Sequence, residues 1–263
     1  MLPVDAIDSE LSEVRGLLFD LDDTLLTHGA LSLEVYESLF ALKNAGFRLI
    51  AVTGRPLGWG EVLLPQWPVD AIVVENGALL LSRKNQRVVL DDPIPMDERR
   101  DRTERLAELG QAVDRAFPTL VRAADAWLRR TDINWDIGET QNVPSETVGA
   151  LETYLRAGGA RATRSSIHAH ATFDDCDKAR GVLHALDALF GESVEDALCR
   201  YAYVGDSVND ASCFERFPLS VGVRNVERHL ALLPKPPRFV TNGSMGNGFN
   251  ELASVLLRAR LRE

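Results

Sequence analysis

The sequence predicts an α/β fold with a second, α+β unit inserted into it. Short apolar runs alternate with amphipathic helical patterns over the first 82 residues, and the same rhythm returns after residue 170. That alternation is typical of a mostly parallel sheet with helices on both faces. Between the two stretches the pattern changes to a hairpin, helices and longer strands. We therefore expect a Rossmann-like, doubly wound parallel sheet core of residues 1–82 and 171–263, and an inserted α+β cap of residues 83–170.

The first part of the core contains three expected strands, at residues 16–21, 47–52 and 71–74. Each is a short, continuous apolar run, which is typical of a strand buried on both faces of a parallel sheet. Between the first two strands, Ser32 is a suitable N-cap for an amphipathic helix, and Gly46 follows the end of that helix. The segment therefore predicts strand, helix, strand and a third strand in succession.

The second part of the core repeats this order. Asp177 is a suitable N-cap for a helix with one apolar face. Further strands are expected at residues 200–204, 219–223 and 239–241, and an amphipathic helix at 248–261 ends the chain. These elements would extend the sheet formed by the first part.

The middle of the chain has a different pattern. Its expected elements are a hairpin of residues 79–81 and 87–90, a charged helix near 97–116, a strand at 127–137, a helix at 144–157 and a strand at 161–173. A mixture of hairpin, helix and strand is typical of a small α+β unit.

Composition limits the functions to consider. The chain has 263 residues and a formal net charge of −10. Nucleic acids and anionic membranes bind basic surfaces, so neither partner is expected. No apolar run approaches the length of about 20 residues that a membrane helix needs, and the acidic N-terminus lacks the apolar core of a signal peptide. With only three cysteines in no metal-binding pattern, we expect a cytoplasmic protein.

Paired acids follow the first expected strand. Asp20 and Asp22 lie two residues apart, so their side chains point to one side of the strand while Leu21 points into the core. Ligands of open α/β sheets bind beyond the carboxyl ends of the strands. One aspartate here would be explained by a turn or a helix cap, but two after a buried strand favour a functional site.

A second acidic segment, GDSVND at residues 205–210, follows the strand expected at 200–204. Asp206 and Asp210 offer hard oxygen ligands, and no histidine or cysteine lies beside them in the segment, so they suit Mg²⁺ better than zinc. Taken alone, the segment could equally be a polar turn. Two acidic strand ends in one sheet favour a magnesium site.

Four further residues could bind a phosphate. Thr53 and Gly54 end the second expected strand and offer a hydroxyl and backbone N–H groups, although a polar turn explains this dipeptide better when it is taken alone. Arg55 could bind substrate or lie in solvent, and Lys178 could be an ordinary surface lysine. One Mg²⁺ and Lys178 would balance the charge of three aspartates, and such a site can accept a phosphate dianion.

The order of the motifs DLDDT, TGRP, a distant lysine and GDSVND resembles the haloacid dehalogenase superfamily of phosphatases. The α+β insert between Thr53 and Lys178, and Asn76-Gly77 after the third strand, resemble the branch of Cof-type, sucrose-phosphate, trehalose-phosphate and mannosyl-3-phosphoglycerate phosphatases. The resemblance implies a Mg²⁺-dependent phosphohydrolase that dephosphorylates a small phosphorylated metabolite, of which a sugar phosphate is one example. The sequence of the insert matches no single substrate.

The resemblance also implies the roles of the acidic residues. Asp20 would be the nucleophile that forms an aspartyl-phosphate, and also a magnesium ligand. Asp22 would be the general acid and base, with its backbone carbonyl on the metal. Asp206 would bind Mg²⁺ directly, and Asp210 directly or through water.

The remaining motif residues would bind the phosphate. By the same resemblance, Thr53 and Lys178 hold the phosphoryl oxygens, with Gly54 and Arg55 beside them. Asn209 would orient Lys178 or the phosphate.

Two histidines of the insert lie on one side of an expected strand. His168 and His170 could contact a substrate hydroxyl or phosphate, but a half-buried polar strand face explains the pair better. We expect the insert as a whole to set the choice of substrate.

Three other functions are compatible with parts of this motif set. A phosphomutase would use the same nucleophile and pass the phosphoryl group on. A signalling receiver binds phosphate on a doubly wound sheet without turnover, but the long insert and Asp22 speak against it. A degenerate binding protein is disfavoured because no core motif residue is missing.

Overall fold

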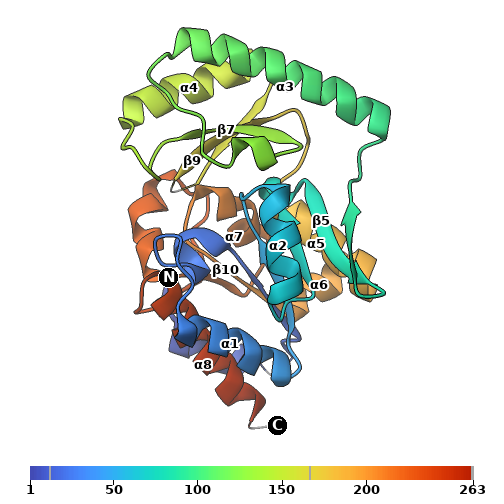
Figure 1. The fold of residues 1–263 in the computed structure, drawn as a ribbon. Helices are drawn as coiled ribbons and strands as arrows, with labels where there is room; N and C mark the ends of the chain where they lie inside the picture. Colours follow the sequence, from blue (N-terminus) through green and yellow to red (C-terminus); the bar gives the residue numbers. More distant parts are fainter. Residues whose placement is uncertain (12, 166, 262–263) are drawn as a thin grey trace.

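The computed structural model describes residues 1–11, 13–165 and 167–261, arranged as a large α/β part below a smaller α+β part (Figure 1). The large part is built on a nine-stranded sheet with the order β1-β12-β11-β10-β2-β3-β4-β5-β6. Its strands are β1 (Leu2–Pro3), β2 (Gly16–Phe19), β3 (Arg48–Val52), β4 (Ala71–Val74), β5 (Leu79–Lys84), β6 (Arg87–Asp91), β10 (Tyr201–Gly205), β11 (Ser220–Gly222) and β12 (Phe239–Val240). In this order the neighbouring strands from β1 through β10 and β2 to β4 are parallel. At the other edge, β5 is antiparallel to β4, and β6 is antiparallel to β5. The predicted fold class is confirmed.

Helices cover both faces of this sheet. One face packs against α1 (Leu33–Asn44), α2 (Leu57–Gln66) and α8 (Met245–Arg260), and the other against α5 (Lys178–Phe190), α6 (Val194–Arg200) and α7 (Ala211–Arg216). Successive strand residues point to opposite faces. Within β2, Leu17 and Phe19 therefore join the first apolar cluster and Leu18 joins the second. Burial on both faces explains why the strands are continuously apolar.

Local signals explain where several helices begin. The Ser32 side chain accepts a hydrogen bond from the Val35 N–H at 3.3 Å, and Asp177 accepts one from the Arg180 N–H at 2.9 Å. Both predicted N-caps are present. Helix α2, which follows TGRP directly, was not predicted, because its glycines at 58 and 60 obscure the helical pattern. Gly60 is required there by packing, since a Cβ would lie 2.3 Å from Leu81.

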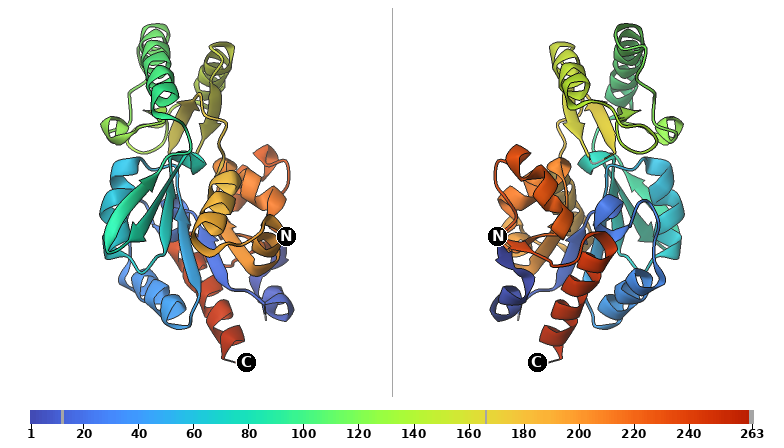
Figure 2. Two further views of the ribbon diagram at one scale, coloured as in Figure 1. Left: turned by 90° about the vertical axis from the view of Figure 1, so that its right-hand side faces the viewer. Right: turned by 90° about the vertical axis from the view of Figure 1, so that its left-hand side faces the viewer.

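The smaller part is a three-stranded antiparallel sheet, ordered β7-β9-β8, under two helices. Its elements are β7 (Asp132–Asp136), β8 (Arg161–Arg164), β9 (His168–Thr172), α3 (Met96–Ala116) and α4 (Ser145–Ala157). Both helices lie on the side of this sheet that faces away from the large part (Figure 2). Trp135, Ala169 and Ala171 pack under the helices, so the opposite face of the sheet is turned toward the large part.

Two expected strands of the middle segment differ from the structure. The long strand at 161–173 is a pair of antiparallel strands, in which Arg161 pairs with Thr172 and Arg164 with Ala169. Between the two strands, the Ser165 N–H donates to the His168 carbonyl at 2.9 Å. Ser166 lies outside the described residues. The strand at 127–137 begins only at Asp132, and residues 126–128 form a short 3₁₀ turn.

The hairpin also lies elsewhere than expected. Residues 83–91 were expected in the insert, but β5 pairs with β4 and β6 with β5, so they extend the large sheet. We call the nine-stranded sheet with its helices the core, and the three-stranded sheet with its helices the cap. None of the helices among the described residues is long and apolar enough to cross a membrane.

Candidate active site

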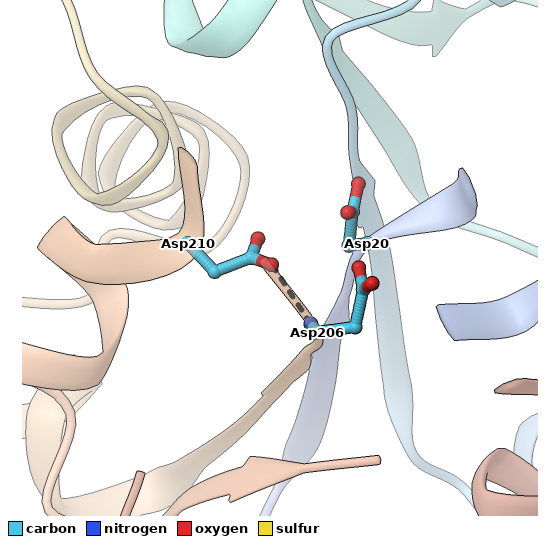
Figure 3. A group of neighbouring side chains, drawn as sticks. All are labelled: Asp20, Asp206 and Asp210. Carbon is cyan, nitrogen blue, oxygen red and sulfur yellow. Dashed lines mark hydrogen bonds between the residues drawn. The ribbon is translucent and has the colours of Figure 1, made fainter. Parts of the chain in front are cut away.

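Three buried carboxylates meet at the carboxyl ends of two neighbouring core strands (Figure 3). Asp20 follows β2, and Asp206 follows β10, which pairs with β2. Asp210 lies in the short helical turn after β10. One carboxylate oxygen of each residue lies within 4.8 Å of those of the other two. The sheet therefore brings together acids that are up to 190 positions apart in the sequence numbering.

Lys178 supplies one positive charge to this cluster. Its Nζ lies 2.8 Å from Asp20 Oδ1 and 2.7 Å from Asp210 Oδ1, and its side chain is fully buried at the N-terminus of α5. Three carboxylates thus face one ammonium group. Burial raises the pKa of Asp20 to about 8 against the opposing effect of Lys178, and burial also raises the pKa of Asp206.

The donor set fits a magnesium ion. All three carboxylates offer hard oxygen ligands, and the excess of negative charge in a buried position needs a cation for compensation. No cysteine or histidine belongs to this cluster, which disfavours zinc. Asp20, Asp206 and Asp210 are the residues that could hold the ion.

Asp210 is the most fully bonded of the three aspartates. Its Oδ2 accepts the backbone N–H groups of Asp206 and Ser207, both at 2.9 Å, while its Oδ1 accepts from Lys178 and the Tyr203 hydroxyl. Gly205 permits this approach, because a Cβ there would lie 2.4 Å from Asp210 Cγ. Asp210 therefore shapes the loop that presents Asp206.

Sequence reasoning missed the residues that orient Asp206. Thr24 Oγ1 donates to Asp206 Oδ1 at 3.2 Å, and Asn225 Nδ2 donates to Asp206 Oδ2 at 2.9 Å. The same Asn225 amide contacts the Asp23 carbonyl, and Asn225 Oδ1 accepts the Met245 N–H. Thr24 belongs to the DLDDT motif and could have been singled out, whereas Asn225 lies in a segment without any such signal.

Asp22 and Arg55 form a pair beside the carboxylate cluster. Arg55 Nε and Nη2 each lie 2.8 Å from one Asp22 oxygen, so both oxygens accept a charge-assisted hydrogen bond. Arg55 Nη1 also contacts Glu139 of the cap at 3.2 Å, and its guanidinium lies 4.4 Å from the ring centre of Trp59. Arg55 is 4% exposed, so the alternative that it lies in solvent is wrong.

The other predicted phosphate-binding residues lie at the same edge of the sheet. Thr53 directly follows β3, the neighbour of β2, and its Oγ1 accepts the Arg55 N–H at 3.0 Å. Gly54 lies against Asn76, where a Cβ would be 3.1 Å from the amide oxygen. Asn209 donates to that Asn76 oxygen at 3.0 Å and has no hydrogen bond to Lys178 among the described contacts.

Both histidines of the cap are buried rather than half-buried, at 2% exposure each. His170 Nδ1 lies 2.8 Å from Asp132, and burial lowers the pKa of His170 to about 4. His168 Nε2 lies 2.9 Å from Glu139, which is the residue that contacts Arg55. His168 is therefore linked to the Asp22–Arg55 pair, and His170 lies on the same core-facing side of the cap sheet, bonded to Asp132.

A cavity of about 400 Å³ lies between the cap and the Asp22 side of the core. The core contributes Asp22, Asp23, His28, Gly29, Arg55, Arg228, His229 and Met245 to its walls, and the cap contributes Gly138, Glu139 and Ile167. Asp20 lies outside this set, so the cavity adjoins the carboxylate cluster on the side of Asp22. It is well placed to receive the part of a ligand that extends from a group bound at the cluster.

Comparisons with known proteins agree with this arrangement. Residues 17–128 match the family model of haloacid dehalogenase-like hydrolases. Similar solved structures include a Thermoplasma acidophilum protein (16% identity, TM-score 0.69) and a haloacid dehalogenase-like hydrolase from Bacteroides thetaiotaomicron (16%, 0.64), each covering 92% of this chain and 98% of its own. The sucrose-phosphatase from Synechocystis sp., solved with sucrose and phosphate, has 18% identity, a TM-score of 0.65 and the same coverage.

No curated protein matches the chain. The similar structures share less than one fifth of their residues with this chain, so they show its fold. The family model adds a likeness in sequence, because the segment that it matches contains Asp20, Asp22 and Thr53. The resemblance inferred from the four motifs is thereby confirmed: residues 17–128 are similar in sequence to haloacid dehalogenase-like hydrolases, and the chain has the fold of these solved structures.

Proposed function

We propose that this hydrolase is a Mg²⁺-dependent phosphatase that acts on a small phosphorylated metabolite through Asp20. The observation that carries the proposal is the buried cluster of Asp20, Asp206, Asp210 and Lys178 at the strand ends, next to a cavity. A phosphate dianion and a divalent cation together fit a site with this charge, because phosphoryl transfer depends mainly on positioning and charge neutralisation.

Asp20 is the nucleophile in this proposal. Its carboxylate attacks phosphorus, the bond to the leaving oxygen breaks, and an aspartyl-phosphate forms. Lys178, which lies 2.8 Å from Asp20, is placed to hold a phosphoryl oxygen, and Thr53 is placed to do so from the end of the neighbouring strand β3. Hydrolysis of the acyl phosphate then returns the Asp20 carboxylate.

Magnesium would be held by Asp20 and Asp206, with the Asp22 carbonyl and Asp210 as further candidates. When bound, it would neutralise the charge of the phosphoryl group and draw it to the carboxylates. Thr24 and Asn225 hold Asp206 in place for this task.

Asp22 is the general acid and base in this proposal. It lines the cavity, where a leaving alkoxide would need a proton and a hydrolytic water would later lose one. Arg55 holds both Asp22 oxygens, so a substrate that enters the cavity has to rearrange this pair before Asp22 delivers a proton.

The cavity supports a proposal for the substrate class. It is large enough for a small organic group, and its polar walls suit a hydroxylated metabolite such as a sugar phosphate better than an apolar ester. A phosphomutase would use the same residues, and the fate of the phosphoryl group distinguishes it: release of inorganic phosphate supports a phosphatase.

The test is turnover of p-nitrophenyl phosphate by the purified chain. We expect release of inorganic phosphate that stops on addition of EDTA and returns with excess Mg²⁺. Binding of phosphate without turnover would instead support a receiver-like binding module and contradict the proposal.

A further inference from the structure

A buried glutamate of the core is bonded to the cap. Glu75 follows β4 with a positive backbone φ of 51°, and it is 1% exposed. A non-glycine residue with this backbone conformation is uncommon and costs free energy, so surrounding contacts must maintain it. The Glu75 carboxylate has no part in the chemistry described above.

The carboxylate accepts hydrogen bonds from both parts of the molecule. From the core, the Leu57 N–H donates at 3.0 Å, and Leu57 is the first residue of α2. From the cap, the N–H groups of Arg130 and Thr131 donate at 3.0 and 2.6 Å, and the Thr131 hydroxyl donates at 2.6 Å. Glu75 thus links the start of α2 to the segment that leads into β7.

The same contacts enclose the loop at residues 53–57, which carries Thr53 and Gly54. The Glu75 N–H donates to the Arg55 carbonyl, and the Asn76 N–H donates to the Thr53 carbonyl, both at 3.0 Å. From the cap side, Arg129 Nη1 donates to the Gly54 carbonyl at 2.9 Å. The loop is therefore held by the Glu75 turn from the core and by Arg129 from the cap.

The buried negative charge of Glu75 costs folding free energy unless every hydrogen-bond partner is in place. Burial raises the pKa of Glu75, and nearby Asp132 adds to the effect, while Thr131 and Arg129 oppose it. A buried carboxylate that loses a partner is strongly destabilised. Displacement of residues 129–131 would remove three donors from Glu75 and one from Gly54, so the loop and this part of the cap should order together.

We propose that Glu75 is a positioning residue that makes the geometry of the phosphate-binding loop depend on docking of the cap. The proposal rests on the function proposed above for Thr53 and Gly54. Phosphate then binds tightly only when residues 129–131 are docked on Glu75. A purely structural glutamate would affect stability without a selective effect on phosphate.

The test compares Glu75→Gln with Glu192→Gln. Glu192 is also buried and bonds to Arg48 and Tyr201 at the opposite end of the sheet, so its substitution is a matched control. In Glu75→Gln we expect the inhibition constant of inorganic phosphate and the KM for p-nitrophenyl phosphate to rise about tenfold, with kcat changing less than about threefold. Thr131→Val, which removes one donor, should shift both constants in the same direction by about twofold.

Amide hydrogen exchange gives a readout that does not need activity. In Glu75→Gln we expect faster exchange at Leu57, Arg130 and Thr131 together, and unchanged exchange there in Glu192→Gln. Faster exchange at Leu57 alone, or at Arg130 and Thr131 alone, would overturn the proposed coupling. An inhibition constant of inorganic phosphate within twofold of that of the unsubstituted chain would overturn it as well. If the unsubstituted chain has no phosphatase activity, the proposed function fails, and exchange alone then decides whether the loop and the cap are coupled.

Discussion

The edge of the core sheet that carries Asp20, Asp206 and Asp210 and the polar face of the cap sheet bury acids in opposite electrostatic settings. At the edge, three carboxylates face one ammonium group, that of Lys178. In the cap, Asp132 lies between Arg129 Nη1 at 2.9 Å and His170 Nδ1 at 2.8 Å. Burial wins at the edge and raises the pKa of Asp20, whereas Arg129 and His170 lower the pKa of Asp132 despite its burial.

We expect this difference to separate a ligand site from a structural network. An excess of buried negative charge is stable only when a cation or a proton compensates it. A balanced network has no such need, and it serves to hold elements together. Substitutions in the two regions should therefore differ in their dependence on Mg²⁺, and the following experiments test that contrast.

The largest effect is expected at Asp20. Asp20→Asn should lower turnover of p-nitrophenyl phosphate by about a thousandfold or more, because an amide is a poor nucleophile. The substitution also removes one of the three crowded carboxylates, so the chain should fold. Asp187→Asn on the exposed side of α5 is the control and should keep full activity. Retention of more than a few per cent of turnover by Asp20→Asn would exclude the covalent mechanism.

Asp206→Asn and Asp132→Asn compare the two regions directly. Asp206→Asn should raise the Mg²⁺ requirement at least about tenfold and should raise the Tm without metal, because repulsion falls. Asp132→Asn should lower stability by about 3 kcal/mol, because Arg129 loses a buried partner, and leave the Mg²⁺ requirement unchanged. Thermal unfolding and activity titrations, each with EDTA or Mg²⁺, measure both effects. An equal dependence on Mg²⁺ in the two variants would refute the contrast.

Stability of the cap should depend on pH through His170. Its pKa is about 4 in the folded chain and 6.5 as the ordinary value, so the unfolded chain binds more protons between these values. Stability is therefore highest above pH 6.5 and falls as the pH drops toward 4, by up to about 3 kcal/mol for this group. Asp132, Arg129 and His168 are the charged or titratable groups that act on His170.

His170→Gln is the variant that checks this pH dependence. The Tm of the unsubstituted chain should fall more steeply between pH 7 and 4.5 than the Tm of His170→Gln. Parallel curves would show that His170 does not titrate as its burial implies.

The smallest expected effect is on substrate choice. Glu139 lines the cavity and contacts both Arg55 and His168. Glu139→Gln should change the ratio of kcat/KM between a sugar phosphate and p-nitrophenyl phosphate about threefold to tenfold. Glu146→Gln, on the exposed side of α4, should leave the ratio unchanged. An equal loss for every ester would mean that the cap acts in catalysis or structure and not in specificity.

Local patterns predicted the core well and the cap less well. The strand at Ala71–Val74 and the caps at Ser32 and Asp177 lie as expected, since each depends on a few neighbouring residues. The β5–β6 hairpin was recognised but assigned to the insert, because strand pairing is decided by partners and not by the strand's own sequence. The two strands at 161–173 were merged for a similar reason, since no strong turn residue separates them.

The sequence by itself determined the fold class, the resemblance to a family and the acidic residues at the strand ends. Those features follow from periodicity and from spacing within short motifs. Only the tertiary structure decided which partners the charged groups take: Arg55 with Asp22 and Glu139, and Glu75 with Thr131. These partners lie between 33 and 84 positions apart, and a charge selects its partner by distance and burial in space, which no local pattern records.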